Sequence, residues 1–130
     1  MTGAVTGALS PLVIAAVLAA GGFGAVLRYS LSRAFPVRPG HLPGGILIVN
    51  VFGSGLAGAL IALAERAELS GDLRLVLVTG FCGGLTTFST WSVETIEMLL
   101  GGRWRAAILN VVVTLALGIA AAAGMYLAVR

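Results

Sequence analysis

The 130-residue sequence contains no lysine, one cysteine, one histidine and few charged side chains of any kind. Charged residues make up 10% of the chain, against about 25% in ordinary globular proteins. Cys82 is the single cysteine, so no intrachain disulfide can form, and we interpret it as a small packing residue. The eight basic residues are all arginines, scattered without a run or stripe, which argues against nucleic-acid binding. At 58% hydrophobic residues, the composition favours a membrane protein.

The sequence also lacks the residue patterns of common enzyme sites. It has no Ser/His/Asp set and no cluster of metal ligands, and His41 has no partner at metal-ligand spacing. The glycine-rich stretches 21–24 and 80–84 fit neither the dinucleotide fingerprint nor a P-loop, since neither follows a strand of a soluble βαβ unit. We therefore predict that the protein is not an enzyme.

Long stretches without charge dominate the chain. No acidic or basic side chain occurs in residues 1–27, 42–64, 75–93 or 106–129. A membrane-spanning helix needs about 20 apolar residues, so we predict an all-α membrane protein with one domain, 1–130, and four transmembrane helices. The expected spans are 11–35, 42–64, 74–99 and 104–129. A secretory signal begins with basic residues, whereas here Arg28 follows the first apolar stretch, so we expect that stretch to remain as a helix.

The basic residues of the loops give little preference for one orientation in the membrane. One side would receive Arg66, Arg74 and Arg130, and the other Arg33, Arg38, Arg103 and Arg105. Two interpretations follow: one topology set by other signals, or insertion both ways up with pairing as an antiparallel homodimer. We favour the homodimer, because so small a protomer offers little interior of its own for an aqueous path.

The third charge-free stretch has the composition of an interrupted helix. A glycine pair, Gly83-Gly84, is followed by five hydroxyl residues: Thr86, Thr87, Ser89, Thr90 and Ser92. Open backbone groups are costly in hydrocarbon, so a broken span must be buried in protein or line a polar cavity. We predict a break at Gly83-Gly84, with unpaired carbonyls before it that suit a cation. A second half starting near Thr86-Thr87 would present free N–H groups that suit an anion.

Further polar and aromatic residues lie at membrane depth. Asn50 belongs to the second span, and Asn110, Thr114 and Gly118 share one face of the fourth. Phe88 and Trp91, three residues apart, place two rings on one helical face, where their positive edges can contact an anion. Each of these residues alone is compatible with ordinary packing or interhelical hydrogen bonding. Together, polar groups at depth in three spans indicate a conduit.

Two charged residues have alternative interpretations. Arg28 ends the first span and is either an anchor reaching the membrane surface or a fixed positive charge at a pore mouth. Glu94 is an acid near membrane depth and therefore a functional candidate.

Three segments together resemble the Fluc (CrcB) family of fluoride channels. They are Gly21-Gly-Phe-Gly-Ala-Val-Leu-Arg-Tyr29, Gly45-Ile-Leu-Ile-Val-Asn-Val-Phe-Gly53 and Gly80-Phe-Cys-Gly-Gly-Leu-Thr-Thr-Phe-Ser-Thr-Trp-Ser-Val-Glu94. The resemblance implies a dual-topology antiparallel homodimer in a bacterial plasma membrane that passively releases cytoplasmic fluoride and so lowers its toxicity. It also implies a structural sodium ion at the dimer centre, held by the backbone carbonyls of Gly83 and Thr86. The implied fluoride pore comprises Asn50, Phe88, Trp91, Thr87, Ser92, Asn110, Thr114, Arg28 and Glu94.

One position departs from the family pattern, and three other assignments stay open. Trp91 stands where the family commonly has a second phenylalanine; its indole offers both a ring edge and an N–H donor, with a different pore width. Pairing with a paralogue in place of a second copy of the chain is one alternative. A small dual-topology proton-coupled multidrug exporter would depend on Glu94. A non-transporting assembly subunit would tolerate Asn50→Asp and Phe88→Ile.

Overall fold

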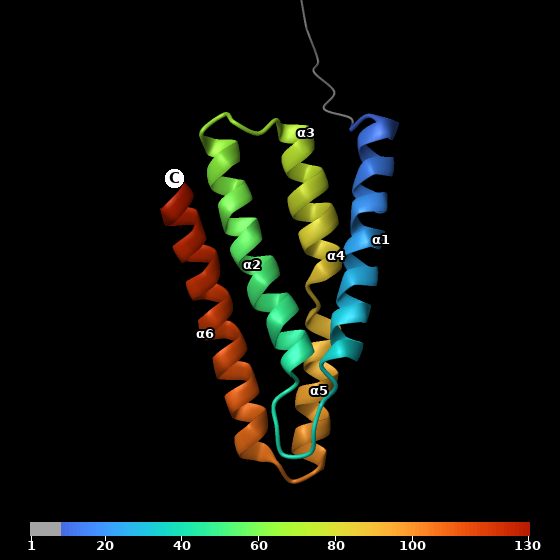
Figure 1. Ribbon diagram of the computed structural model, residues 1–130, viewed down its shortest axis with the longest axis vertical. Helices are drawn as coiled ribbons and strands as arrows, with labels where there is room; N and C mark the ends of the chain where they lie inside the picture. The colour runs from blue at the N-terminus through green and yellow to red at the C-terminus, as the bar shows by residue number, and fades with distance from the viewer. Residues whose placement is uncertain (1–8) are drawn as a thin grey trace, which may run out of the picture.

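The computed structural model describes residues 9–130, all of whose regular elements are helical (Figure 1). In chain order the elements are α1 (Pro11–Ala34), α2 (Gly44–Glu65), α3 (Gly71–Arg74), the π-helical segment η1 (Leu75–Cys82), α4 (Gly83–Leu85), α5 (Phe88–Leu100) and α6 (Trp104–Val129). α3, η1 and α4 run on directly from one another and form, with α5, one 30-residue span, Gly71–Leu100. The described residues thus contain four helices long and apolar enough to cross a membrane.

The four predicted membrane-spanning helices and the interruption of the third are confirmed. Each helix begins and ends within three residues of its expected span. Successive spans run in opposite directions, so the α2–α3 loop lies at the same end as the start of α1 and the end of α6 (Figure 1). The α1–α2 and α5–α6 loops lie together at the opposite end.

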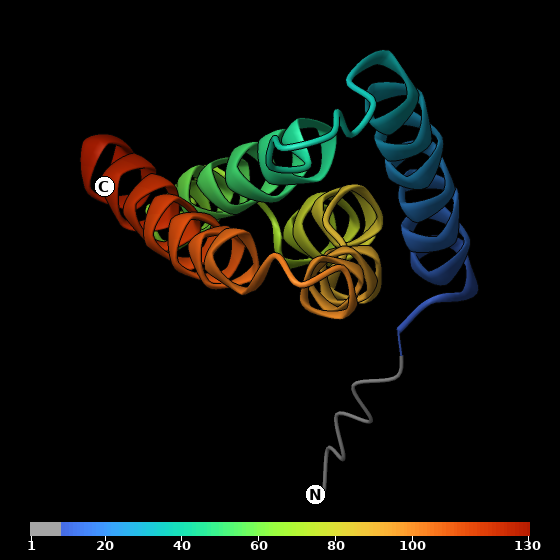
Figure 2. The same ribbon diagram turned by 90° about the horizontal axis from the view of Figure 1, so that it is seen from below.

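Small residues allow the helices to approach closely. α2 packs against α6, where a methyl group at Gly58 would overlap the backbone of Ala122. On the other side of the protomer, α1 packs against η1 and α4, and Figure 2 shows α1 set apart from the α2–α6 pair. The buried core lies between these groups and is formed by Ile46, Val49 and Leu85. Glycine-mediated contact of this kind is typical of membrane helices.

The third span breaks after the glycine pair and not at it, which corrects the predicted position. Gly83 and Gly84 are helical, and the chain leaves the helix at Thr86 (φ −82°, ψ 154°) and Thr87 (φ −147°, ψ 123°). The reason is that Gly84 serves packing: a side chain there would collide with the backbone of Gly21 in α1. Glycine here provides space for a neighbouring helix and does not end the helix.

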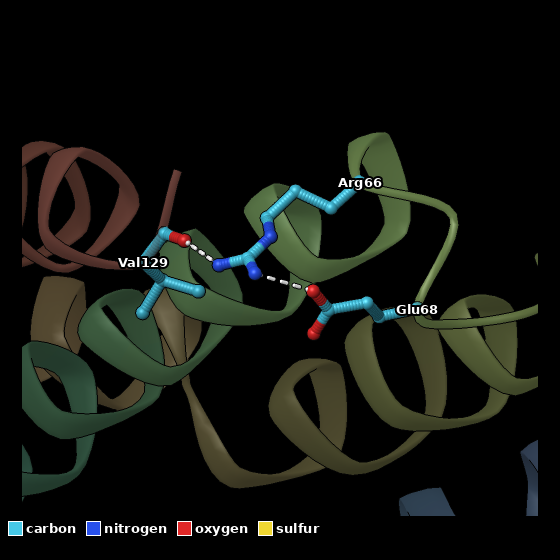
Figure 3. A network of polar contacts seen from close by, with 3 residues as sticks. All are labelled: Arg66, Glu68 and Val129. Carbon is cyan, nitrogen blue, oxygen red and sulfur yellow. Dashed lines mark hydrogen bonds and ion pairs between the residues drawn. The ribbon is translucent and has the colours of Figure 1, made fainter.

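A polar network ties the α2–α3 loop to the end of α6 (Figure 3). Arg66 donates from Nη1 to the carbonyl of Val129 at 2.7 Å and pairs through Nη2 with Glu68 Oε1 at 2.5 Å. Ala67, between the two paired residues, has a φ of 59°, in the left-handed region that non-glycine residues rarely adopt. A basic side chain at a helix C-terminus satisfies a carbonyl that has no intrahelical partner.

Candidate functional site

The break in the third span exposes two peptide units that two neighbouring helices contact. Arg28 of α1 donates from Nη1 to the Thr86 carbonyl at 3.4 Å. Asn50 of α2 makes two hydrogen bonds to Thr87: its Oδ1 accepts from the Thr87 N–H at 2.8 Å, and its Nδ2 donates to the Thr87 carbonyl at 3.1 Å. The break is thus held by side chains from separate helices, as buried backbone groups in a membrane require.

Thr87 also begins α5. Its backbone is extended, and its Oγ1 accepts from the Thr90 N–H at 3.2 Å, which is the N-cap arrangement that threonine favours. The same oxygen lies 3.2 Å from the hydroxyl groups of Ser89 and Thr90. The hydroxyl-rich sequence therefore caps the second half of the span and gathers O–H groups at its positive dipole end.

The carbonyl of Gly83 loses its helical donor at the break. In an uninterrupted helix the Thr87 N–H would donate to that carbonyl, but here it donates to Asn50. The first half of the span therefore ends in backbone oxygen at Gly83, where a Cβ would meet only the Val78 carbonyl, at 3.8 Å. In residues 9–130 no group of three or more His, Cys, Asp or Glu side chains is placed to hold a metal ion. Backbone carbonyls are thus the candidate cation ligands in this part of the chain.

A cavity of about 450 Å³ opens beside the break. Its walls come from α2, the break, α5 and α6, and no charged side chain contributes to them. The lining residues are Asn50, Ser54, Thr86, Thr87, Phe88, Trp91, Thr114 and Leu115. Its polar side-chain groups are hydroxyl groups, the amide of Asn50 and the indole N–H of Trp91, so the cavity provides hydrogen-bond donors without a carboxylate.

The two aromatic rings of α5 border this cavity in different ways. Phe88 is 77% exposed, whereas Trp91 is half-buried and packs on the core of Ile46, Val49 and Leu85. Their ring centroids lie 5.4 Å apart with the planes tilted by 50°. The Nε1 of Trp91 is buried and finds no acceptor among residues 9–130. The predicted common face is confirmed, and one member carries an unpaired donor.

α6 contributes two buried polar residues on one face. Asn110 donates from Nδ2 to Thr95 Oγ1 at 3.0 Å, and Thr95 donates to the Trp91 carbonyl at 2.7 Å. Thr114, one turn further along, is 8% exposed, lines the cavity and has no hydrogen-bond partner for its Oγ1 within the described part of the chain. Asn110 thus joins α6 to α5, while Thr114 presents an unpaired hydroxyl.

Comparison with known proteins places this arrangement in a family. The model of the family described as "CrcB-like protein, Camphor Resistance (CrcB)" matches residues 15–125. The chain belongs to the CrcB family. The family expected from the sequence is therefore confirmed, and the chain is a multi-pass membrane protein.

Relatives of the CrcB family carry channel names. A protein of Serratia proteamaculans, "Fluoride-specific ion channel FluC", is 42% identical over 102 residues, which cover 78% of this chain and 80% of the relative. A protein of the same name from Pyrococcus furiosus is 46% identical over 99 residues, covering 75% and 80%. "Fluoride-specific ion channel FluC 1" of Mycobacterium bovis is 45% identical over 109 residues, covering 83% of each chain. These names describe channels and not enzymes, in line with the predicted lack of enzyme activity.

Some of the predicted pore residues line the cavity beside the break, and others lie elsewhere. Asn50, Thr87, Phe88, Trp91 and Thr114 line it, together with Thr86, which was predicted as a sodium ligand. Ser92 lies outside it and donates to the Phe88 carbonyl at 2.7 Å. Glu94 lines a separate cavity of about 210 Å³ beside Glu97 and Arg103. Arg28 and Asn110 contact the break and α5, respectively, without lining the cavity.

Sequence reasoning missed two residues of the site. Ser54 lines the cavity and donates to the Asn50 carbonyl at 2.7 Å, a role that was not predicted from the sequence. Thr95 joins Asn110 to the backbone of α5. Thr95 follows Trp91 by four residues, which places both on one helical face. That spacing was the feature of the sequence from which its position beside the site could have been predicted.

Proposed function

We propose that the chain is a fluoride-selective channel that lets fluoride leave the cytoplasm passively across a bacterial plasma membrane. The observation that carries this proposal is the cavity at the helix break, whose polar side-chain groups are hydroxyl, amide and indole N–H groups and include no carboxylate. The names of the relatives, fluoride-specific ion channels, support the choice of anion. Fluoride is small and strongly hydrated, so its path must replace water with donors placed at short range.

Donors converge on this cavity from three helices. Asn50 supplies an amide from α2, Thr114 a hydroxyl from α6, and α5 begins at the Thr87 cap with its positive dipole end. Phe88 adds a largely exposed ring whose edge carries partial positive charge. A carboxylate in the wall would repel an anion, and none is present. The wall is therefore complementary to a dehydrated anion.

We further propose that the working unit is an antiparallel homodimer. The protomer exposes large apolar side chains of the third span and α1, including Phe88 and Phe23, and Phe23 stacks on Phe81 with ring centroids 5.9 Å apart. Gly83, close to Phe81 in the chain, is exposed at the break. The nearly equal arginine counts at the two ends are compatible with insertion in both orientations.

A sodium ion at the dimer centre is compatible with the backbone at the break. The carbonyls of Gly83 and Thr86 would hold it: Gly83 has lost its helical donor, and Thr86 accepts only the 3.4 Å bond from Arg28. Carbonyl oxygens suit hard cations. The ion would supply a fixed positive charge that holds two copies of the break together.

Fluoride release from liposomes containing the purified protein tests the channel proposal. We expect rapid loss of fluoride without comparable loss of chloride, measured with ion-selective electrodes beside protein-free liposomes. Equal leakage of both anions, or no fluoride loss above the protein-free control, would count against the proposal.

One observation favours a second candidate, a proton-coupled multidrug exporter. Glu94 has a buried Oε2 without a hydrogen-bond partner in residues 9–130, and an acid in a span is the expected site of proton coupling. Under this alternative, Glu94→Gln abolishes drug-dependent proton movement and fluoride flux is absent. Under our proposal, the same variant releases fluoride and shows no drug-coupled proton movement.

A further inference from the structure

The carboxamide of Asn50 forms a closed pair with a single residue across the break. Its Oδ1 accepts from the Thr87 N–H at 2.8 Å, and its Nδ2 donates to the carbonyl of the same residue at 3.1 Å. The backbone has fixed polarity, so the orientation of the amide follows from its partners: oxygen must face the N–H and nitrogen must face the carbonyl. The side chain thereby replaces the neighbouring strand that an extended residue would normally pair with.

We propose that Asn50 is a positioning residue that clamps the helix break. Thr87 is extended between two helical segments: its N–H has left the ladder of the first segment, and its carbonyl lies at the start of α5 on the open side of the break. Hydrocarbon offers such backbone groups no partner at membrane depth. One side chain from α2 satisfies both groups at once, which fixes α2 against the start of α5. Among the described residues, the one other side chain bonded to the backbone of the break is Arg28, which donates to the preceding residue, Thr86, at 3.4 Å.

The clamp also leaves one N–H group of Asn50 free to donate into the cavity. A primary amide has two hydrogens on nitrogen, and the pair with Thr87 uses one of them together with Oδ1. Rotating the amide by half a turn would break both bonds and set like groups against each other. Asn50 lines the cavity, and the hydrogen not used by Thr87 is a donor. Asn50 therefore keeps one N–H that it can donate into the cavity, a consequence that rests on the proposed anion channel.

Hydrogen exchange at the Thr87 amide tests the clamp without any transport measurement. We expect this N–H to exchange at least about tenfold faster in Asn50→Leu than in the unmodified protein, both in detergent without fluoride, because Leu removes its acceptor. Asn110→Leu is the matched control, since it removes an amide that is bonded to α5 away from the break. Equal Thr87 exchange in Asn50→Leu and the unmodified protein would overturn the clamp.

Asn50→Asp keeps the bonds to Thr87 but removes the second N–H donor. It also keeps the clamp testable if Asn50→Leu does not fold. A protonated aspartic acid restores both bonds to Thr87, since one oxygen accepts and the O–H donates, but it has no second N–H. Either protonation state of the new carboxyl accepts from the Thr87 N–H, so we expect Thr87 to exchange at least about tenfold more slowly in Asn50→Asp than in Asn50→Leu at the same pH. Fluoride flux at neutral pH should stay at least tenfold below that of the unmodified protein. Thr87 exchange as fast in Asn50→Asp as in Asn50→Leu would refute the proposal.

The two proposals fail in different ways. If liposomes with unmodified protein release no fluoride, the channel proposal is wrong, while Thr87 exchange still reports on the clamp. If they release fluoride and Thr87 exchange is insensitive to Asn50, the channel proposal stands and the clamp is wrong.

Discussion

Thr114 is a polar side chain that the fold leaves without a hydrogen bond. Its Oγ1 is buried in the cavity wall and has no partner in residues 9–130. A buried unpaired hydroxyl costs about 1–3 kcal/mol, and valine has the same shape without that group. We predict that Thr114→Val raises the free energy of unfolding by about 1 kcal/mol while lowering fluoride flux about tenfold, because a donor to the ion is lost. Thermal unfolding and liposome efflux measure the two effects.

Thr95→Val provides the contrasting variant, since its hydroxyl is fully used. Thr95 accepts from Asn110 and donates to the Trp91 carbonyl; the same chemical change leaves the Asn110 N–H unpaired, while the Trp91 carbonyl keeps its helical donor. We expect a loss of about 1–3 kcal/mol in stability. If the two valine variants shift stability in the same direction, the assignment of Thr114 as an unpaired donor is wrong.

The sequence predicted which polar residues lie at membrane depth but not what they bond to. Asn50 and Asn110 are both asparagines within apolar spans, and the same reasoning applied to each. In the structure Asn50 pairs with the backbone of the break, whereas Asn110 pairs with the side chain of Thr95. The difference depends on how each helix is rotated and on which neighbour it faces, and a single sequence contains neither piece of information.

At the scale of the element, the contact between α1 and α4 depends on the absence of a side chain. A methyl group at Gly84 would overlap the backbone of Gly21, and backbone cannot rotate aside as a side chain can. We predict that Gly84→Ala destabilises the protein by about 1–3 kcal/mol or more, seen as a lower unfolding temperature in detergent. Gly124→Ala in α6 is the control, because a Cβ at Gly124 would meet nothing within 4 Å. Similar losses for both variants would contradict this account of the contact.

The glycine pair Gly83-Gly84 explains why the position of the break was predicted incorrectly. Glycine in a helical span indicates either conformational freedom or close approach of another backbone. Only the packing of α1 shows that the second reason applies at Gly84. A better signal was present three residues later, since Thr87 with Thr90 has the spacing of an N-cap and its N3 position. That spacing locates the start of α5 without reference to other helices.

The loop between α2 and α3 contains strained backbone. Ala67 has a φ of 59°, which costs about 1–2 kcal/mol for a residue with a Cβ. Glycine adopts this conformation freely but gains entropy in the unfolded chain. We predict that Ala67→Gly raises the free energy of unfolding by about 0.5–1 kcal/mol, measured by thermal unfolding. Ala64→Gly, inside α2, should lower it by a similar amount, and the reverse order would contradict the prediction.

At the scale of the whole molecule, the charge-free stretches provided the most reliable prediction from the sequence, that of the membrane-spanning helices. Hydrocarbon admits few charges and requires every backbone group to be paired, so length and charge alone predict four helices. The order of packing was not predictable in this way. α2 lies against α6, and α1 lies against η1 and α4, because small residues at particular faces allow close contact. Nothing in the charge pattern distinguishes these pairs from others.

The proposed antiparallel dimer makes a prediction about both ends of the molecule. His41 lies in the α1–α2 loop and Asp72 lies in α3, and both are exposed. That loop and α3 are at opposite ends of the bundle (Figure 1). Neither residue is an arginine that contributes to the orientation rule. We predict that a cysteine at either position, introduced singly after Cys82→Ala, is labelled from outside the cell in about half of the copies, because a two-fold antiparallel pair places each end on both sides. An impermeant maleimide measures the outer fraction, and labelling after permeabilisation gives the total. Complete labelling at one position together with none at the other would show a single orientation and exclude the antiparallel dimer.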